Sequence, residues 1–311
     1  MMILEEVSPE KYHEIVKSYK YFYNSTQFHD LNKYKVEKVV YLLFKTKKYK
    51  IGIIAGIHNK VFKVPYSAPF SMFEFLSVNV RLDDICSAVC LIDDYVKEKQ
   101  LSAVEICLPP SFYDRSGIAK VQNSLLNNGY KIAVCDLNFQ FFLKNMLMYR
   151  TQLHRNARKN LEIANRQGFI LIHCETEGDK RRAYDIIKMN RDAKGRPLRM
   201  TYEQITDTIK LTEHDFFIAR LGDVDVAAAI VFRINEAVYQ VIYWGDAGGY
   251  SEKKPMNYIS AQLYEFYADR GVLVLDIGPS TEEGMPNFGL CDFKESIGCE
   301  IDTKYTFRKN F

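Results

Sequence analysis

Residues 238–249 read VYQVIYWGDAGG and predict the centre of the fold, a buried strand that runs into a glycine-rich turn. Val238–Trp244 is apolar, aromatic and β-branched, as expected of a buried strand. Three glycines in the next five residues break the strand. Pro255 suits the first turn of a helix, so the sequence predicts strand, turn and helix in succession.

The chain beyond this helix predicts a second buried strand, a loop, a short helix and a closing strand. Val272–Ile277 is apolar apart from one acid, Asp276. Asn287 can cap the short helix that carries Lys294, and Glu300–Phe307 predicts the last strand. Strands and helices in this order are typical of an α/β fold.

Length and composition leave room for one large domain or two of about 150 residues each. The net charge of +3 is too small to indicate nucleic-acid binding by itself. No signal peptide and no apolar run of about 20 residues is present, which predicts a cytoplasmic protein. Seven cysteines without paired spacing predict no metal site.

The two halves of the sequence have similar predicted element orders. In each, a hairpin is followed by a helix, a strand, another helix and a strand. We therefore expect a mixed α/β protein with two domains, residues 1–149 and 150–311. Residues 61–75 interrupt the first half with two prolines and several aromatic residues, among them Tyr66. This segment could line a substrate pocket or fill a core.

The glycine turn is a candidate anion site. Gly248 and Gly249 lead toward a helix N-terminus, where unpaired N–H groups and the helix dipole favour a negative charge, and Lys253 and Lys254 stand beside it. The spacing matches neither the phosphate loop of nucleotide triphosphatases nor the dinucleotide fingerprint. An ordinary turn flanked by two solvated lysines is the alternative.

Arg150–Gln167 predicts the most basic helix of the chain, followed by Gly168. Arg155, Arg158 and Lys159 lie mostly off its apolar stripe. The helix is either a solvated linker or a cationic surface for the phosphates of tRNA, a nucleotide or a lipid diphosphate.

The segment LHRNARKNLEIANRQGF, the hairpin AAAIVFRINEAVYQVIYWGDA and the ending LVLDIGPSTEEGMPNFGLCDFKESIG resemble the second domain of Fem-type aminoacyltransferases. The family patterns are "R-x-x-R-K-x-x-x-x-A" for the helix and "D-x-G … G-L-x-x-F-K-x-x-F-G" for the ending. The similarity covers Gln152–Phe307. It implies a tandem pair of GNAT-like (acetyltransferase-fold) domains. Ile297 replaces the family's usual aromatic residue before Gly298, and the glycine turn departs from the loop of CoA-dependent GNAT enzymes.

The resemblance implies N-acyl transfer to an amine, with Lys294 stabilising the developing oxyanion or the leaving group. Asp276, at the end of a buried strand, could accept the amine proton or orient the acceptor. Tyr243, Trp244, Phe293 and Tyr66 are the residues we expect around the substrate.

No tightly bound cofactor is expected, and acyl-CoA and aminoacyl-tRNA are the candidate donors. The acceptor would be an amine on a cell-envelope (peptidoglycan-type) precursor, an amino sugar or a peptide, with tRNA and a transiently used membrane-surface substrate as further partners. Two alternatives remain. One is a CoA-dependent acetyltransferase that uses only the second domain, and the other is an inactive pair of GNAT-like domains that acts as a binding module.

Overall fold

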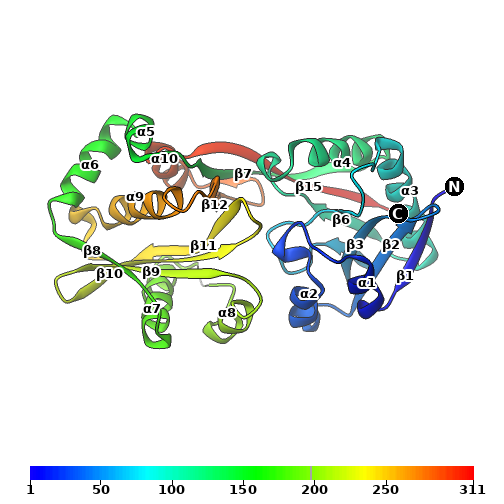
Figure 1. Cartoon of the computed structure of the whole chain (residues 1–311), viewed down its shortest axis with the longest axis horizontal. Coiled ribbons are helices and arrows are strands. Elements are labelled where there is room, and N and C mark those ends of the chain that lie inside the picture. The colour runs from blue at the N-terminus through cyan, green and yellow to red at the C-terminus, as the bar shows by residue number, and fades with distance from the viewer. Residues whose placement is uncertain (197) are drawn as a thin grey trace. The chain divides into compact units, whose positions relative to one another are not determined.

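The computed structural model describes every residue of the chain except Pro197. The chain forms two compact units, which are Met1–Asp136 together with Asp302–Phe311, and Leu137–Ile301 (Figure 1). Among the described residues, none of the helices is long and apolar enough to span a membrane.

The first unit is a mixed sheet with helices on both faces (Figure 1). Its strands lie in the order β1-β2-β3-β4-β6-β15, with β5 beside β3. Its elements are β1 (Ile3–Val7), α1 (Pro9–Ile15), η1 (Phe22–Asn24), α2 (Thr26–Asn32), η2 (Lys33–Lys35), β2 (Lys38–Lys45), β3 (Tyr49–His58), β4 (Val61–Val64), β5 (Glu74–Phe75), α3 (Leu82–Glu98), β6 (Ala103–Cys107), η3 (Ser111–Tyr113), α4 (Arg115–Asn127) and the start of β7 (Lys131–Phe142), where η denotes a 3-10 helix.

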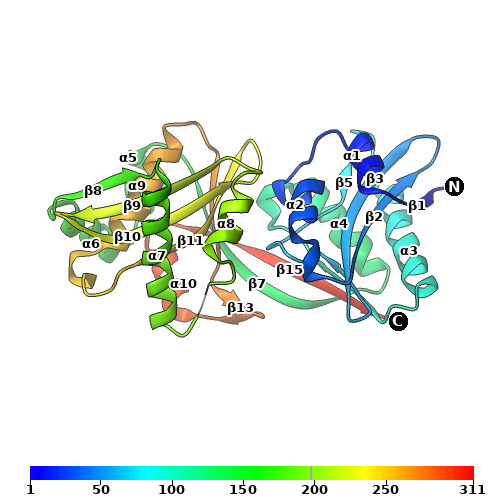
Figure 2. The ribbon, with the colours of Figure 1, turned by 90° about the horizontal axis from the view of Figure 1, so that it is seen from below.

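The second unit has a sheet of the order β7-β12-β11-β10-β9-β8. Helix α7 packs on one face of β9–β11 and α9 on the other, as Figures 1 and 2 show. Its elements are the rest of β7, α5 (Met146–Gln152), α6 (Arg155–Asn165), β8 (Phe169–His173), α7 (Glu177–Ala193), α8 (Tyr202–Thr208), β9 (His214–Leu221), β10 (Val224–Arg233), β11 (Val238–Asp246), η4 (Ser251–Lys253), α9 (Pro255–Ala268), β12 (Val274–Pro279), β13 (Thr281–Glu282), β14 (Met285–Pro286), α10 (Phe288–Ser296) and the first two residues of β15 (Glu300–Asn310).

The two halves of the chain repeat one element order, as the sequence predicts. Setting aside α5, α6, the two-residue strands and the 3-10 helices, β1-α1-α2-β2-β3-β4-α3-β6-α4-β7 corresponds to β8-α7-α8-β9-β10-β11-α9-β12-α10-β15. The last strand of each half pairs within the other unit, since β15 joins β6 and β7 joins β12, both antiparallel. The compact units therefore differ from the expected division at residues 149 and 150. Residues 137–149 belong to the second unit, where β7 pairs with β12, and Asp302–Phe311 belong to the first, where β15 pairs with β6.

The segment between β4 and β5 fills the core of the first unit. β4 runs parallel to β6 as far as Val64. The chain then leaves β4, and the Ser71 N–H donates to the carbonyl of Cys107 at the end of β6 (2.9 Å). Phe70 and Phe73 are buried on either side of this contact. Of the two interpretations of residues 61–75, the structure supports the core-filling one.

Glu74, at the end of this core-filling segment, holds it in place through hydrogen bonds. Its carboxylate accepts hydrogen bonds from Asn24 Nδ2 (2.7 Å) and the Lys20 N–H (3.1 Å). The Asn24 amide oxygen in turn accepts from the Ser71 hydroxyl (2.8 Å). Burial raises the pKa of Glu74 to about 7 despite these donors.

One sequence prediction in the second unit needs correction. The basic helix predicted over Arg150–Gln167 is two helices, α5 and α6, separated by Leu153 and His154. Both residues have extended backbone angles, and His154 becomes the N-cap of α6. The sequence has no proline or glycine here to predict a helix break. Leu153 is buried, so packing of this side chain in the core accounts for the break.

We predict that Glu74 makes the first unit less stable as the pH rises. A carboxyl whose pKa is raised on folding from 4.5 to about 7 stabilises the fold fully below pH 4.5, and this stabilisation is lost as the pH passes 7. Between about pH 5 and about pH 8, the wild type should lose about 2–3 kcal/mol of unfolding free energy relative to Glu74→Gln. Urea denaturation of both proteins at the two pH values measures the difference, and parallel pH profiles would contradict the prediction.

Candidate functional site

The parallel strands β11 and β12 separate within residues 238–249, the stretch from which the sequence predicts the centre of the fold. They pair only from Val238 opposite Val274 to Gln240 opposite Asp276. Beyond that point β11 continues beside β10 to Asp246, whereas β12 continues beside β7. The backbone of β11 after Gln240 therefore has an edge from which its neighbour has departed. Ligands of open α/β sheets commonly bind at the carboxyl ends of such strands.

Asp276 is the last residue of β12 that pairs with β11, and its carboxylate accepts hydrogen bonds from three donors. Asn138 Nδ2 donates to one oxygen (2.8 Å), Gln240 Nε2 donates to the other (2.6 Å), and the Gly278 N–H donates at 2.8 Å. Asp276 is fully buried, and the donors come from β7, β11 and its own strand. The carboxylate thus ties together the strands that flank the separation.

Lys294 on α10 reaches the same strand end from the other direction. Its ammonium group donates to three consecutive carbonyls of β12, those of Ile277 (3.1 Å), Gly278 (2.9 Å) and Pro279 (3.1 Å). Three acceptors use all three protons of a lysine ammonium. Lys294 is only 2% exposed, and burial lowers its pKa to about 8.

Gly278 connects the buried acid to the buried base. Its N–H donates to Asp276 while its carbonyl accepts from Lys294. Its φ of +75° lies in the left-handed region that favours glycine, and the β12–β7 register shifts at this point. The bulge thus presents three successive carbonyls to Lys294.

The structure brings together Lys294 and Asp276, the two residues that we expected to carry the chemistry. It places them in a supporting position, since the protons of Lys294 are all donated to backbone carbonyls. An oxyanion contact would require Lys294 to release one of these bonds.

The expected substrate residues separate into different environments. Trp244 belongs to the core on the α9 side of the sheet and packs edge-on against Phe293 (6.2 Å between centroids). Tyr66 lies in the first unit, where its hydroxyl donates to the carbonyl of His29 (2.8 Å). Tyr243 also lies on β11 beyond the last pair with β12, and it is on the α7 side of the sheet, close to Arg191.

Arg191, near the end of α7, is a site residue that sequence reasoning missed. It is half-buried, burial lowers its pKa, and Tyr243, Arg196 and Arg199 are its charged or titratable neighbours. No carboxylate pairs with Arg191 among the described residues, whereas Arg199 pairs with Glu282 (3.8 Å). An arginine in this position can hold an anionic group of a ligand.

The remaining missed residues are the amides Asn138, Gln140 and Gln240. Each is a buried polar residue between two hydrophobic residues of its strand, a signal that the sequence carries. Gln140 lies opposite Asp276 on β7, and its buried amide oxygen has no hydrogen-bond partner in the part of the chain that the structure describes.

The glycine turn has the backbone of a turn, as the sequence predicts, and it lies on the surface of the second unit. Gly248 and Gly249 have φ of +77° and +74°, and space is open where a Cβ would lie. Lys254 adopts a left-handed conformation as the N-cap of α9, without a side-chain cap. Lys253 is exposed, with Gln167 3.4 Å from its amine. The turn remains a candidate anion site.

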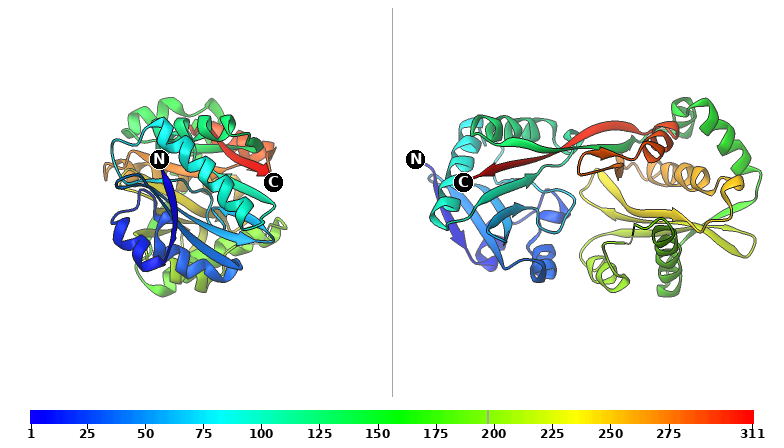
Figure 3. Two further views of the ribbon diagram at one scale, coloured as in Figure 1. Left: turned by 90° about the vertical axis from the view of Figure 1, so that its right-hand side faces the viewer. Right: turned by 180° about the vertical axis from the view of Figure 1, so that it is seen from behind.

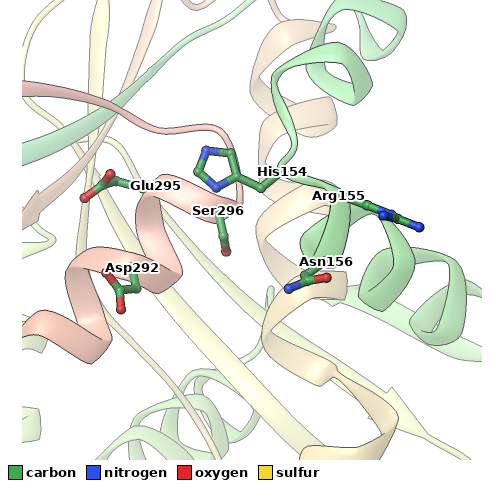
Figure 4. Close-up of a pocket in the computed structure, with 6 residues that line it drawn as sticks. All are labelled: His154, Arg155, Asn156, Asp292, Glu295 and Ser296. Atoms are coloured by element: carbon green, nitrogen blue, oxygen red, sulfur yellow. The ribbon is translucent and has the colours of Figure 1, made fainter.

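The basic helix α6 does not join the β12 site directly. Its first turn and the end of α10 line a cavity of about 490 Å³, bounded by His154, Arg155, Asn156, Asp292, Glu295 and Ser296 (Figure 4). Figure 4 shows Arg155 extending away from the two carboxylates. Arg158 and Lys159 are exposed, and Arg158 donates to the carbonyl of Leu153 (3.3 Å).

Comparison with known proteins establishes the fold. No protein-family profile and no curated protein sequence matches the chain. FemX has a TM-score of 0.71 at 11% identity, over 99% of this chain and 97% of FemX. L-PGS from Bacillus licheniformis has 0.60 at 12% identity, over 98% and 92%. A tandem GNAT protein from the clavulanic acid biosynthesis pathway has 0.51 at 8% identity, over 100% and 98%. The predicted tandem GNAT-like α/β fold, shared with a Fem-type protein, is confirmed.

We predict that Lys294→Met destabilises the second unit. Each buried carbonyl left without its donor costs about 1–3 kcal/mol, and removing a buried charge recovers part of that loss. The net decrease in unfolding free energy should be about 2–4 kcal/mol. Lys253→Met, which alters an exposed lysine, should change it by less than about 0.5 kcal/mol. Equal stability of the two variants in urea denaturation would show that the three bonds contribute little.

Proposed function

We propose that the chain is an N-acyltransferase and that the carboxyl ends of β11 and β12 form its active site. The observation that carries the proposal is the separation of these strands after Asp276, with the end of β12 fixed by Lys294. The fold shared with FemX, L-PGS and the tandem GNAT protein supports transferase chemistry.

The reaction needs a neutral amine, an acyl donor and a leaving group. The amine nitrogen attacks the acyl carbonyl, a C–N bond forms, and the C–O bond of an aminoacyl-tRNA ester or the C–S bond of a CoA thioester breaks. The amine loses a proton, and the leaving oxygen or sulfur gains one. The edge of β11 after Gln240 can hold the donor, since an extended chain that carries amides can add to a strand edge.

Asp276 and Lys294 act in this proposal as positioning residues. Together they fix the bulge at Gly278, which keeps β12 away from β11. Arg191 and Tyr243 stand nearby on the α7 side, and they supply a positive charge and a hydroxyl for the polar part of a substrate. The acceptor is an amine on a cell-envelope precursor, an amino sugar or a peptide.

A comparison of the two units favours a single site in the second. In the first unit, the corresponding strands β4 and β6 also separate, but the segment around Ser71 hydrogen bonds to the end of β6. This observation keeps a CoA-dependent enzyme that uses only the second unit as the second candidate function.

The first experiment identifies the donor. Acetyl-CoA, longer acyl-CoA thioesters and aminoacyl-tRNA are tested for thermal stabilisation, with and without UDP-linked amino sugars and peptides. A ligand at about 100 times its Kd should add about 2.7 kcal/mol to the free energy of unfolding. Product formation is then followed by mass spectrometry. Stabilisation without any transfer would favour a binding module over an enzyme.

We predict that Arg191→Gln weakens substrate binding more than it slows turnover. Loss of one charge-assisted hydrogen bond costs about 1.5–3 kcal/mol, so KM should rise about ten- to a hundredfold while kcat changes less than about threefold. The matched control is Lys188→Gln on the same helix, where the lysine is exposed and pairs with Asp192 (2.5 Å). Equal KM values for the two variants would remove Arg191 from the site.

A further inference from the structure

Helices α5 and α6 concentrate the positive charge of the chain. From Lys144 to Arg166 the sequence has six basic residues and one acid, Glu162, a formal charge of +5. Because the whole chain carries +3, all other residues together carry −2. The basic residues are Lys144, Arg150, Arg155, Arg158, Lys159 and Arg166.

Among these cations, Arg158 donates a hydrogen bond to the backbone carbonyl of Leu153 (3.3 Å). All six side chains are exposed, and none forms an ion pair within the part of the chain that the structure describes. On α6 the buried residues Ala157, Leu161 and Ala164 mark the inner face, which packs on α9. Arg155, Lys159 and Arg166 follow each other by four and seven residues, so they share the opposite face.

Aliphatic side chains are exposed among these cations. Leu147 is 73% exposed and Met148 40%, both on α5, and Ile163 on α6 is 36% exposed. The only aromatic residue of the two helices, Tyr149, is buried. Figure 3 (right) shows the two green helices on the side of the orange helix α9 that faces away from the sheet.

We propose that this outer surface of α5 and α6 docks the protein on a bilayer that contains anionic lipids. Basic residues attract acidic headgroups, and exposed aliphatic side chains gain free energy when they enter the boundary between headgroups and acyl chains. A single-stranded nucleic acid would also match the charge, but its bases stack on aromatic side chains, and it offers little to exposed leucine and methionine. The exposed aliphatic residues therefore favour an anionic bilayer over a single-stranded nucleic acid.

Co-sedimentation with vesicles tests the charged part of the surface. The wild type should bind vesicles of phosphatidylglycerol and phosphatidylcholine, should bind phosphatidylcholine alone weakly, and should dissociate as salt is raised. Each basic residue contributes a factor of about five, so Arg155→Gln, Lys159→Gln and Arg166→Gln together should lower the partition coefficient about 100-fold. The control is Lys17→Gln, Lys47→Gln and Lys48→Gln, which removes the same charge from exposed positions of the first unit.

A second pair of variants tests the apolar part of the surface. Leu147→Gln with Met148→Gln keeps every charge and should lower vesicle binding about tenfold. Val78→Gln with Leu126→Gln, two exposed aliphatic positions of the first unit, should bind as the wild type does. The proposal is overturned if the wild type does not bind anionic vesicles, or if the Leu147 and Met148 variant binds them normally. Tight binding of tRNA without vesicle binding would assign the surface to nucleic acid instead.

Discussion

The three hydrogen bonds from Lys294 to the end of β12 determine the local structure on which the candidate site depends. A strand that leaves its neighbour exposes backbone carbonyls, and buried carbonyls without donors are costly. Sheet pairing cannot satisfy the groups that the bulge at Gly278 turns out of the ladder. One ammonium group supplies three donors at once, and no neutral side chain can do so. The buried ammonium group of Lys294 thus helps to stabilise the separation of β11 and β12.

The charge is tolerated because the surroundings compensate for it. Asp276 is buried a short distance along the same strand, and its own charge is balanced by three donors. Burial lowers the pKa of Lys294, and the carboxylate of Asp276 acts in the opposite direction. The first unit satisfies the corresponding strand end with a backbone donor instead of a buried lysine. There the chain itself supplies the donor, the N–H of Ser71, to the end of β6. The gap beside the end of β6 is filled by the segment around Ser71, whereas β11 and β12 remain separated after Gln240 and Asp276.

Local patterns made most strands and helices predictable. The β-branched and aromatic run Val238–Trp244 predicted a strand, and the helical spacing of apolar residues in Leu82–Glu98 predicted a helix. The side chain of Asn287 suggested an N-cap, and it caps α10. The exchange of β7 and β15 was not predictable, because a strand's pattern shows that it is buried but not which strand lies beside it. Lys294 and Asp276 were found through a family resemblance and through one acid in an apolar strand. Arg191 lies in a helix rich in charges, and only the fold shows that no carboxylate of the described residues pairs with it.

The distribution of charge connects the site to the surface of the second unit. α10 carries Lys294 on its inner side, and its end is fastened to α6, where the N–H of His154 donates to the carbonyl of Ser296 (2.9 Å). The helix that positions the candidate active site is therefore directly bonded to the start of the most basic helix. An amine carried by a lipid-linked precursor would be drawn to the basic surface by long-range attraction, while its acylation would depend on short-range contacts near Gly278. Salt should weaken the first effect and leave the second unchanged, because Lys294 and Asp276 are shielded from solvent. If such a substrate is used, ionic strength should act on KM far more than on kcat.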